Sequence, residues 1–199
     1  MAEVLTQKWK HDLRTPINVA EGYIQLLLNG LGGDLQPQQQ FYIEGIKVSC
    51  YIMKILLKNF CVLNQIEEEE FKLDEKSGQL SEVFSRVASE LERAFQAKNA
   101  HIFIEANGAH YHNGMDLCEK TVANLLIIAM NTVKSNSNLL IKAECTQGEI
   151  RIVLTGEQVT GCEFGGALEL VGKYADLLDG RFEITPGQLL VAYPEEKFN

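Results

Sequence analysis

A long helical repeat of apolar residues dominates the first thirty positions, and a proline lies inside it. The apolar residues recur at steps of three and four, which predicts one amphipathic helix over residues 3–29 with a buried stripe. The members of that stripe are Trp9, Leu13, Ile17, Ala20, Ile24, Leu27, Leu28 and Leu31. Pro16 costs roughly 3 kcal/mol in a helix interior and removes a backbone hydrogen bond, so a kink is expected there. A proline at this position needs a functional reason.

His11 is predicted on the side of this helix away from the apolar stripe. It lies two residues after Trp9, about 200° around a helix of 3.6 residues per turn, which turns the imidazole toward solvent. The residues that follow at helical spacing share its face: Arg14, Thr15, Asn18, Gly22 and Gln25. A neutral imidazole is a nucleophile that can accept a phosphoryl group and release it again. The alternative is a surface histidine without chemistry.

Charge and cysteine content exclude several classes of function. The net charge of −9 argues against a nucleic-acid partner, because no basic stripe offsets it. The five cysteines lack CxxC spacing, which predicts reduced thiols and no metal site: Cys50, Cys61, Cys118, Cys145 and Cys162. The N-terminus shows no signal peptide, and no apolar run reaches the roughly 18 residues of a membrane span. We expect a cytoplasmic protein without a membrane partner.

A second helix is predicted after a glycine-rich break, over residues 34–66 with Pro37 in its first turn. Its main stripe comprises Tyr42, Ile46, Ser49, Met53, Leu56, Phe60 and Leu63, and a second apolar flank comprises Val48, Ile52, Ile55, Val62 and Ile66. This face is wider than one partner helix can cover. An antiparallel hairpin that forms a four-helix bundle as a symmetric homodimer would cover it. The alternative is that the second domain covers the surplus.

The composition changes after the acidic run at 67–70, which predicts domains over 1–68 and 69–199. We expect a short strand at 71–74, a turn at 75–78, and helices at 80–99, 115–133 and 165–178. A strand is expected at 101–106, and hairpins at 139–154 around Gln147-Gly148 and at 181–192 around Pro186-Gly187. Helices on one face of a mixed sheet give an α/β sandwich, so the fold class is α+β.

The segment His11-Asp12-Leu13-Arg14-Thr15-Pro16, followed by Ile17, resembles the H-box of bacterial two-component histidine kinases. In that family the histidine carries the phosphoryl group. The order of elements in the second domain is similar to the kinases' ATP-binding domain, so the resemblance covers essentially the whole chain. It implies that the helical hairpin is the dimerisation and phosphotransfer domain.

Two positions depart from the kinases' nucleotide-binding pattern. The segment at 124–131 resembles the N-box, but Ile128 stands where that motif supplies an amide ligand for Mg²⁺. Leu154 stands where the following box has an aspartate, and leucine cannot accept a hydrogen bond from adenine. The lid is shortened to residues 157–164. The glycines at 165–166 precede a helix whose N-terminus could face a phosphate, although a plain turn explains them equally well.

An intact H-box beside a degenerate ATP-binding domain resembles the dimeric, kinase-like histidine phosphotransferases of bacteria (the ChpT and sporulation-phosphorelay types). The resemblance implies that His11 is the phosphoacceptor, relaying a phosphoryl group between response-regulator receiver domains, with Asp12, Arg14 and Thr15 assisting. Asn18, Gly22 and Gln25 would contact the receiver. It also implies no cofactor on this chain, with Mg²⁺ carried by the receiver.

Three alternatives stay open at this point. Asp12 could orient His11, or it could instead pair with a receiver lysine, because adjacent helical residues do not face each other. The chain could be a divergent ATP-dependent histidine kinase if Asn124 replaced the missing amide. It could also be a non-catalytic dimer that binds receivers. Metal binding by His110 and His112 is disfavoured, because nothing nearby completes a ligand set.

Overall fold

The computed structural model describes residues 2–106, 110–111, 114–156 and 165–195. For residues 2–10, 110–111, 115 and 165 it describes the backbone alone. The chain divides into two compact units, Met1–Phe71 and Lys72–Asn199.

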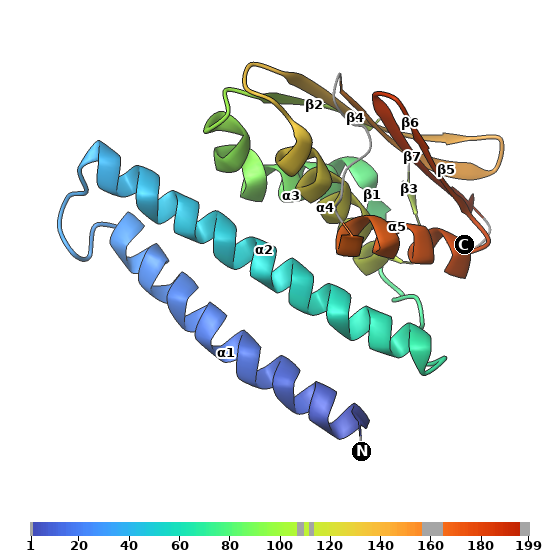
Figure 1. Cartoon of the computed structure of the whole chain (residues 1–199), viewed down its shortest axis with the longest axis horizontal. Helices are drawn as coiled ribbons and strands as arrows, with labels where there is room; N and C mark the ends of the chain where they lie inside the picture. The colour runs from blue at the N-terminus through green and yellow to red at the C-terminus, as the bar shows by residue number, and fades with distance from the viewer. Residues whose placement is uncertain (1, 107–109, 112–113, 157–164, 196–199) are drawn as a thin grey trace. The chain divides into compact units, whose positions relative to one another are not determined.

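The first unit is an antiparallel helical hairpin (Figure 1). Helix α1 spans Ala2–Leu28 and continues through Pro16, and helix α2 spans Pro37–Glu67. Gly30 and Gly33 in the connection have φ of 79° and 95°, a conformation that glycine adopts without steric cost. Pro37 is within the first turn of α2, where its missing N–H is not needed. The two helices therefore begin and end close to where the sequence signals predict.

Within one chain, only part of the apolar surface predicted on the hairpin is buried. In the stripe predicted for the first helix, Ile24 is buried while Leu13 and Leu27 of α1, and Leu31 just after it, are exposed. In α2 most of the predicted main stripe is exposed. The second flank supplies buried residues of α2, among them Val48, Ile55 and Val62. The repeat identifies both apolar flanks of α2 but cannot tell which of them a neighbour within the chain covers.

A salt bridge joins the two helices across the hairpin. Lys54 Nζ of α2 lies 2.9 Å and 3.0 Å from the two carboxylate oxygens of Glu21 of α1. Both side chains are partly buried, so this pair is less screened than a surface pair.

The second unit is a five-stranded mixed sheet with three helices on one face (Figure 1). The strands are β2 (His101–Ala106), β4 (Asn138–Thr146), β5 (Glu149–Gly156), β6 (Arg181–Thr185) and β7 (Gln188–Pro194). The helices are α3 (Leu80–Gln96), α4 (Met115–Thr132) and α5 (Gly165–Leu177). The sheet order is β2-β4-β5-β7-β6, with β2 parallel to β4 and the other pairs antiparallel. The α+β class predicted from the sequence is confirmed.

Turn residues fix the register of the two hairpins in this sheet. Gln147 and Gly148 have φ of 55° and 78°, the left-handed pair that matches the twist of two antiparallel strands. Gly187 has φ of 83° and closes the second hairpin, with Thr185 opposite Gln188. Both turns lie where the sequence predicts them.

The segment between the two units is not the strand that the sequence suggests. Residues 71–77 carry no regular secondary structure, and the predicted strand at 71–74 is therefore wrong. A short ribbon follows instead, in which β1 (Gly78–Gln79) pairs antiparallel with β3 (His110–Tyr111). Alternation over two residues is too short to leave a periodic signal.

The four described cysteines are free thiols. Cys50, Cys61 and Cys118 are buried free thiols, and Cys145 is a half-buried one. In the described part of the chain, no group of three potential metal-ligating side chains comes together. None of the described helices is both long enough and apolar enough to cross a membrane.

Candidate phosphoacceptor site

His11 projects from the exposed side of α1. Its side chain is 82% exposed, so the imidazole is available to a partner. The five residues predicted on its face are exposed as well: Arg14, Thr15, Asn18, Gly22 and Gln25. A Cβ added at Gly22 would meet nothing within 4 Å, and the Gln25 amide donates to Asn29 at 3.2 Å. Trp9, the predicted anchor opposite His11, lies among residues whose side chains are not described.

Asp12 approaches His11 although the two are neighbours in sequence. His11 Nδ1 lies 3.6 Å from Asp12 Oδ1. The carboxylate therefore faces one ring nitrogen, and the other, Nε2, points away from it. The contact is exposed, because the Asp12 side chain is 58% accessible, so solvent screens it. The helix wheel alone argued against this contact, because it ignores how far two flexible side chains can bend toward each other.

Thr15 is bound to the backbone one turn below it. Its Oγ1 donates to the carbonyl oxygen of His11 at 3.0 Å. Pro16 has no N–H to give to the carbonyl of Asp12, yet the helix continues to Leu28. The hydroxyl of Thr15 thus belongs to the helical turn that carries His11.

A shallow groove runs along α1 from His11. Its walls are His11, Asp12, Thr15, Pro16, Val19, Ala20 and Tyr23. Val19 and Tyr23 continue the ridge of His11 and Thr15 at steps of four, and the Tyr23 side chain is 66% exposed. Sequence reasoning missed both. The available signal was an aromatic and a β-branched residue on the otherwise polar side of the helix. Arg14, Asn18, Gly22 and Gln25 do not line this groove.

In the second unit, the positions that bind Mg·ATP in the kinase pattern carry buried apolar side chains. Ile128 of α4 and Leu154 of β5 are 1% and 0% exposed. Neither side chain has a nitrogen or oxygen atom, so neither can bind Mg²⁺ or accept a hydrogen bond from adenine. Asn124 is also buried, and its amide donates to the carbonyl of Lys120 at 2.9 Å. These residues do not fit the nucleotide as a kinase would hold it. The shortened lid at 157–164 lies outside the described residues.

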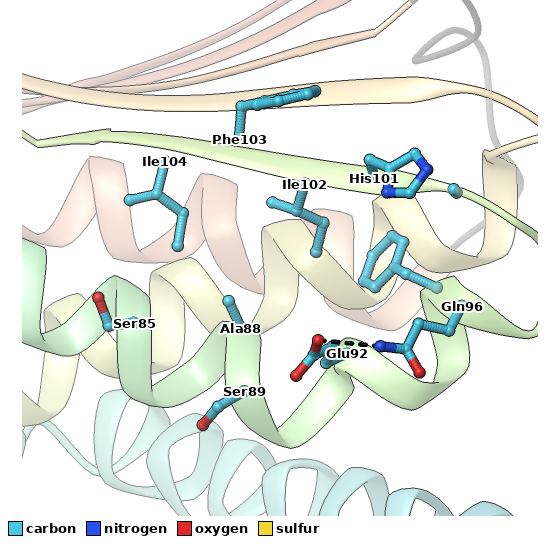
Figure 2. A pocket seen from close by; sticks show the side chains of 11 residues that line it. Ser85, Ala88, Ser89, Glu92, Gln96, His101, Ile102, Phe103 and Ile104 are labelled. Carbon is cyan, nitrogen blue, oxygen red and sulfur yellow. Dashed lines mark hydrogen bonds between the residues drawn. The ribbon is translucent and has the colours of Figure 1, made fainter.

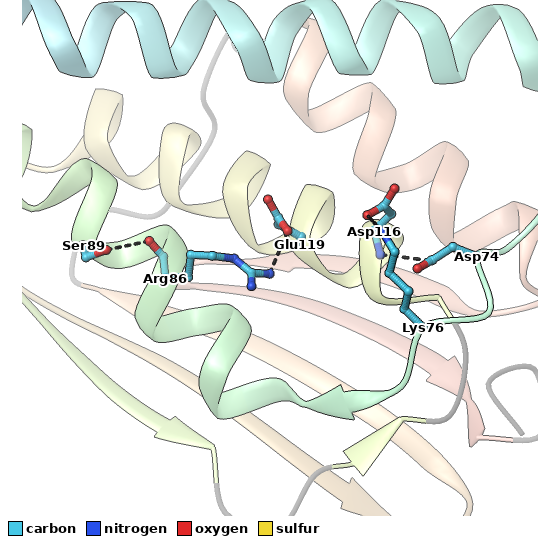
Figure 3. Close-up of polar contacts among 6 residues, drawn as sticks. All are labelled: Asp74, Lys76, Arg86, Ser89, Asp116 and Glu119. Atoms are coloured by element: carbon cyan, nitrogen blue, oxygen red, sulfur yellow. Dashed lines mark hydrogen bonds and ion pairs between the residues drawn. The ribbon is translucent and has the colours of Figure 1, made fainter. Parts of the chain in front are cut away.

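Polar contacts hold the start of α4 in place (Figure 3). The backbone N–H of Asp116 donates to Asp74 Oδ1 at 3.0 Å, and Lys76 Nζ lies 3.7 Å from Asp116 Oδ1. Arg86 of α3 binds Glu119 of α4 at 2.8 Å. Beneath them Cys118 is fully buried, and burial, with a smaller effect of Asp74, raises the pKa of its thiol to about 12. This region is built for packing and not for thiol chemistry.

The other sequence candidates are described only in part. His101 is exposed on β2. The side chain of His110 lies outside the described residues, and so do His112 and Cys162. The glycine pair begins α5 at Gly165.

The family comparison agrees with the geometry around His11. Residues 2–69 match the family of the His Kinase A (phospho-acceptor) domain. No curated protein matches the sequence.

Solved structures show that the whole chain has the fold of two-component histidine kinases. The histidine kinase AdeS of Acinetobacter baumannii superposes with a TM-score of 0.62 at 14% identity, covering 93% of this chain and 98% of that one. Full-length ShkA in complex with AMPPNP superposes with a TM-score of 0.62 at 14% identity, covering 96% of this chain and 45% of that one. The histidine kinase ThkA, in complex with the response regulator protein TrrA, superposes with a TM-score of 0.51 at 14% identity. The match covers 97% of this chain and 61% of that one.

Proposed function

We propose that this chain is a histidine phosphotransferase, which moves phosphoryl groups between response-regulator receivers through His11 without using ATP. The observation that carries the proposal is a combination: an exposed imidazole within a phospho-acceptor domain, and apolar side chains at the two nucleotide-binding positions of the kinase-like domain. The first supports phosphoryl transfer on histidine. The second supports a phosphoryl source other than ATP.

The transfer chemistry follows from the geometry of the ring. In the tautomer that carries its proton on Nδ1, the nitrogen nearer Asp12, the lone pair of Nε2 is free to attack phosphorus. The N–P bond forms as the P–O bond of the donor's aspartyl phosphate breaks, and the aspartate carboxylate leaves with the electron pair. The ring then carries a positive charge, which the Asp12 carboxylate stabilises. A second receiver's aspartate reverses the sequence and restores neutral His11.

The neighbours of His11 position the partner in this proposal. Arg14 can meet phosphate oxygens or a receiver carboxylate with its guanidinium. Thr15 stabilises the helical turn that carries His11. Asn18, Gly22 and Gln25 provide a flat polar surface, and Val19 and Tyr23 add an apolar one. The receiver supplies the Mg²⁺ that neutralises the phosphoryl charge, since alignment and charge neutralisation are most of what this transfer needs.

The partners in this proposal are response-regulator receivers and a second copy of the chain. ThkA, which has the same fold, was solved with a response regulator. The exposed stripe of α2 supports a homodimer: Ile46 and Leu56 are 53% and 52% exposed, and Tyr42, Met53 and Phe60 extend the same line. A contiguous apolar stripe of this kind is a typical interface, and a twofold axis would bury it in a four-helix bundle. We assign the protein to the cytoplasm, where free thiols persist.

The second candidate is an ATP-dependent histidine kinase. Its support is the likeness in fold to ShkA, which was solved with AMPPNP. It would need other residues to replace the polar groups missing at Ile128 and Leu154, and the buried Asn124 amide is already hydrogen-bonded to Lys120.

Radiolabel transfer separates the candidates. The purified chain is incubated with the host's phosphorylated receivers, one at a time, and separately with labelled Mg·ATP. We expect label on the chain from at least one receiver and none from ATP. His11→Gln should abolish labelling, while His101→Gln, which removes another exposed histidine, should label like the wild type.

Two results would contradict the proposal. Autolabelling from ATP that depends on His11 would identify a kinase. Absence of label from every receiver, together with binding of one of them, would identify a non-catalytic receiver-binding dimer.

A further inference from the structure

Strand β2 forms one edge of the sheet in the second unit. Within the described strands it pairs with β4 alone, in parallel. An unpaired edge presents backbone N–H and C=O groups that can pair with another chain. The open edge of β2 can therefore pair with a strand of another chain.

The hydrogen-bonding groups on this edge can be assigned residue by residue. The N–H of His101 donates to the carbonyl of Ser137, just before β4, at 3.0 Å. Backbone groups alternate in direction along a strand, so Phe103 and Glu105 also face β4. Ile102 and Ile104 then point their N–H and C=O groups outward, to the open edge.

The side chains divide between the two faces in the same alternating way. Figure 2 shows Ile102 and Ile104 pointing toward α3, with His101 and Phe103 on the opposite face of the strand. Phe103 is 55% exposed, which is unusual for a phenylalanine in a sheet. Beneath the edge, a groove of about 470 Å³ lies between α3 and β2, with Ala88, Ser89 and Glu92 among its lining residues.

The residues of β2 on either side of Phe103 are alike or complementary. One isoleucine lies on each side of it at positions 102 and 104, and an imidazole and a carboxylate lie two positions away at His101 and Glu105. In the described part of the chain neither His101 nor Glu105 makes a side-chain hydrogen bond. Lys142, opposite Glu105 on β4, is bound to Glu144 at 2.7 Å, and Glu105 makes a weaker electrostatic contribution to the raised pKa of Lys142.

We propose that β2 pairs antiparallel with β2 of a second copy of this chain, in a register centred on Phe103, so that the two sheets become continuous. This interface is separate from the hairpin and does not depend on the proposed phosphotransfer. Ile102 and Ile104 of one copy lie opposite Ile104 and Ile102 of the other, and their outward groups form two reciprocal pairs of backbone hydrogen bonds.

Each side chain of the strand finds a complement in this register. The two Phe103 rings lie opposite each other in a non-hydrogen-bonded pair, where side chains approach most closely. His101 of each copy lies opposite Glu105 of the other, on the same face as the rings. The isoleucines of the second copy extend over the groove next to α3. A register shifted by one residue would oppose Phe103 to an isoleucine on the other face, which the pleat forbids.

This complementarity favours a second copy over an unrelated peptide. Charges on an edge strand usually prevent pairing. Here an imidazole, which can donate a hydrogen bond, and a carboxylate, which accepts one, are spaced so that a twofold axis brings them together.

Light scattering of the full-length chain over a range of concentrations tests the proposal. Phe103→Lys places two ammonium groups opposite each other, so the wild type should reach about twice the average mass of this variant at high concentration. If the hairpin also dimerises, each dimer presents two β2 edges, so the wild type should form species larger than two dimers while the variant stops at the hairpin dimer. Equal masses for the two proteins at every concentration would overturn the proposal.

A charge exchange provides a second test that preserves the apolar residues. His101→Glu alone should weaken association, because two carboxylates then oppose each other. Glu105→Lys alone should weaken it too, because the carboxylate that accepts a hydrogen bond from His101 is lost. The double variant His101→Glu/Glu105→Lys should restore it, since the pairs are complementary again. Glu183→Lys, on the opposite edge strand β6, is the matched control and should associate like the wild type. A double variant that associates no better than either single one would contradict the register.

Discussion

At the scale of single residues, the two nitrogens of His11 have different surroundings. Nδ1 faces the Asp12 carboxylate at 3.6 Å, and the rest of the ring is open to solvent. An exposed carboxylate at this distance cannot hold the ring rigidly, because solvent screens the contact and both side chains rotate. Its expected role is to fix the proton on Nδ1 and to stabilise the charged ring when phosphate arrives.

Asp12→Asn should slow phosphorylation of His11 by about 10²-fold, the low end of the range for general acid–base groups, because the amide cannot stabilise the positive ring. The measurement is single-turnover labelling from a phosphorylated receiver. Asp34→Asn removes the same charge from the exposed interhelical connection and should leave the rate unchanged. If the Asp12 variant labels at the wild-type rate but binds the receiver more weakly, the carboxylate contacts the receiver instead.

Cys118 leads to a prediction about alkaline stability. Burial raises its pKa from 9.0 to about 12, so the folded chain keeps the thiol proton where the unfolded chain loses it. Stability is therefore fully present below pH 9 and falls as the pH rises toward 12. Cys118 alone should cost about 1 kcal/mol of unfolding free energy between pH 9 and pH 10.

Urea unfolding at these two pH values measures that loss. Cys118→Ala lacks the titrating thiol and should lose about 1 kcal/mol less than the wild type over the same interval. Cys61→Ala, which removes another buried free thiol, is the matched control. An identical pH dependence in wild type and Cys118→Ala would contradict the raised pKa.

At the scale of elements, the exposed stripe of α2 is the feature that a single chain leaves unexplained. Tyr42, Ile46, Met53, Leu56 and Phe60 repeat at steps of three, four and seven on one side of the helix. Val48, Ile55 and Val62 on the adjacent flank are already buried. The stripe is thus additional to the apolar surface that this chain covers.

Ile46→Glu should prevent hairpin association, because a twofold interface would place two buried carboxylates near each other. Sedimentation equilibrium of the full chain at low concentration measures the loss of one association step. Gln65→Glu adds the same charge at an exposed position away from the stripe and should behave like the wild type. If Ile46→Glu keeps the wild-type mass and remains folded, the stripe is not the interface.

At the scale of the whole molecule, the chain has the fold of two-component histidine kinases. Ile128 and Leu154 are packed in the interior of its second unit. The sheet and helices depend on this burial and not on a ligand, so the fold by itself does not decide whether a nucleotide binds.

Mg·ATP should leave the melting temperature of the full chain unchanged. A nucleotide bound to the folded state would stabilise it by about 2.7 kcal/mol at 100 times its dissociation constant, which differential scanning fluorimetry detects. A histidine kinase that binds AMPPNP serves as the positive control under the same conditions. A saturable increase in melting temperature would show that the pocket still binds nucleotide, and would favour the kinase.

Much of the fold could be predicted from local signals in the sequence. Periodicity located α1, α2, α3, α4 and α5 to within a few residues, and turn residues such as Gln147-Gly148 and Pro186-Gly187 located both hairpins. The strand predicted at 71–74 is wrong because a short apolar alternation also occurs in irregular segments. Strands β1 and β3 were not predicted, because two residues are too few to show a pattern. The roles of the residues around His11 stay a prediction, because exposure alone does not test them.

The sequence by itself determined the elements, the fold class and the exposed imidazole, because helix and strand periods and turn chemistry are local properties of the chain. Only the tertiary structure decided which flank of α2 is buried, that Val19 and Tyr23 form a groove with His11, and that β2 lies at an open edge. Burial and strand order depend on which distant segments come together. The free energy of those contacts is not encoded in any local repeat.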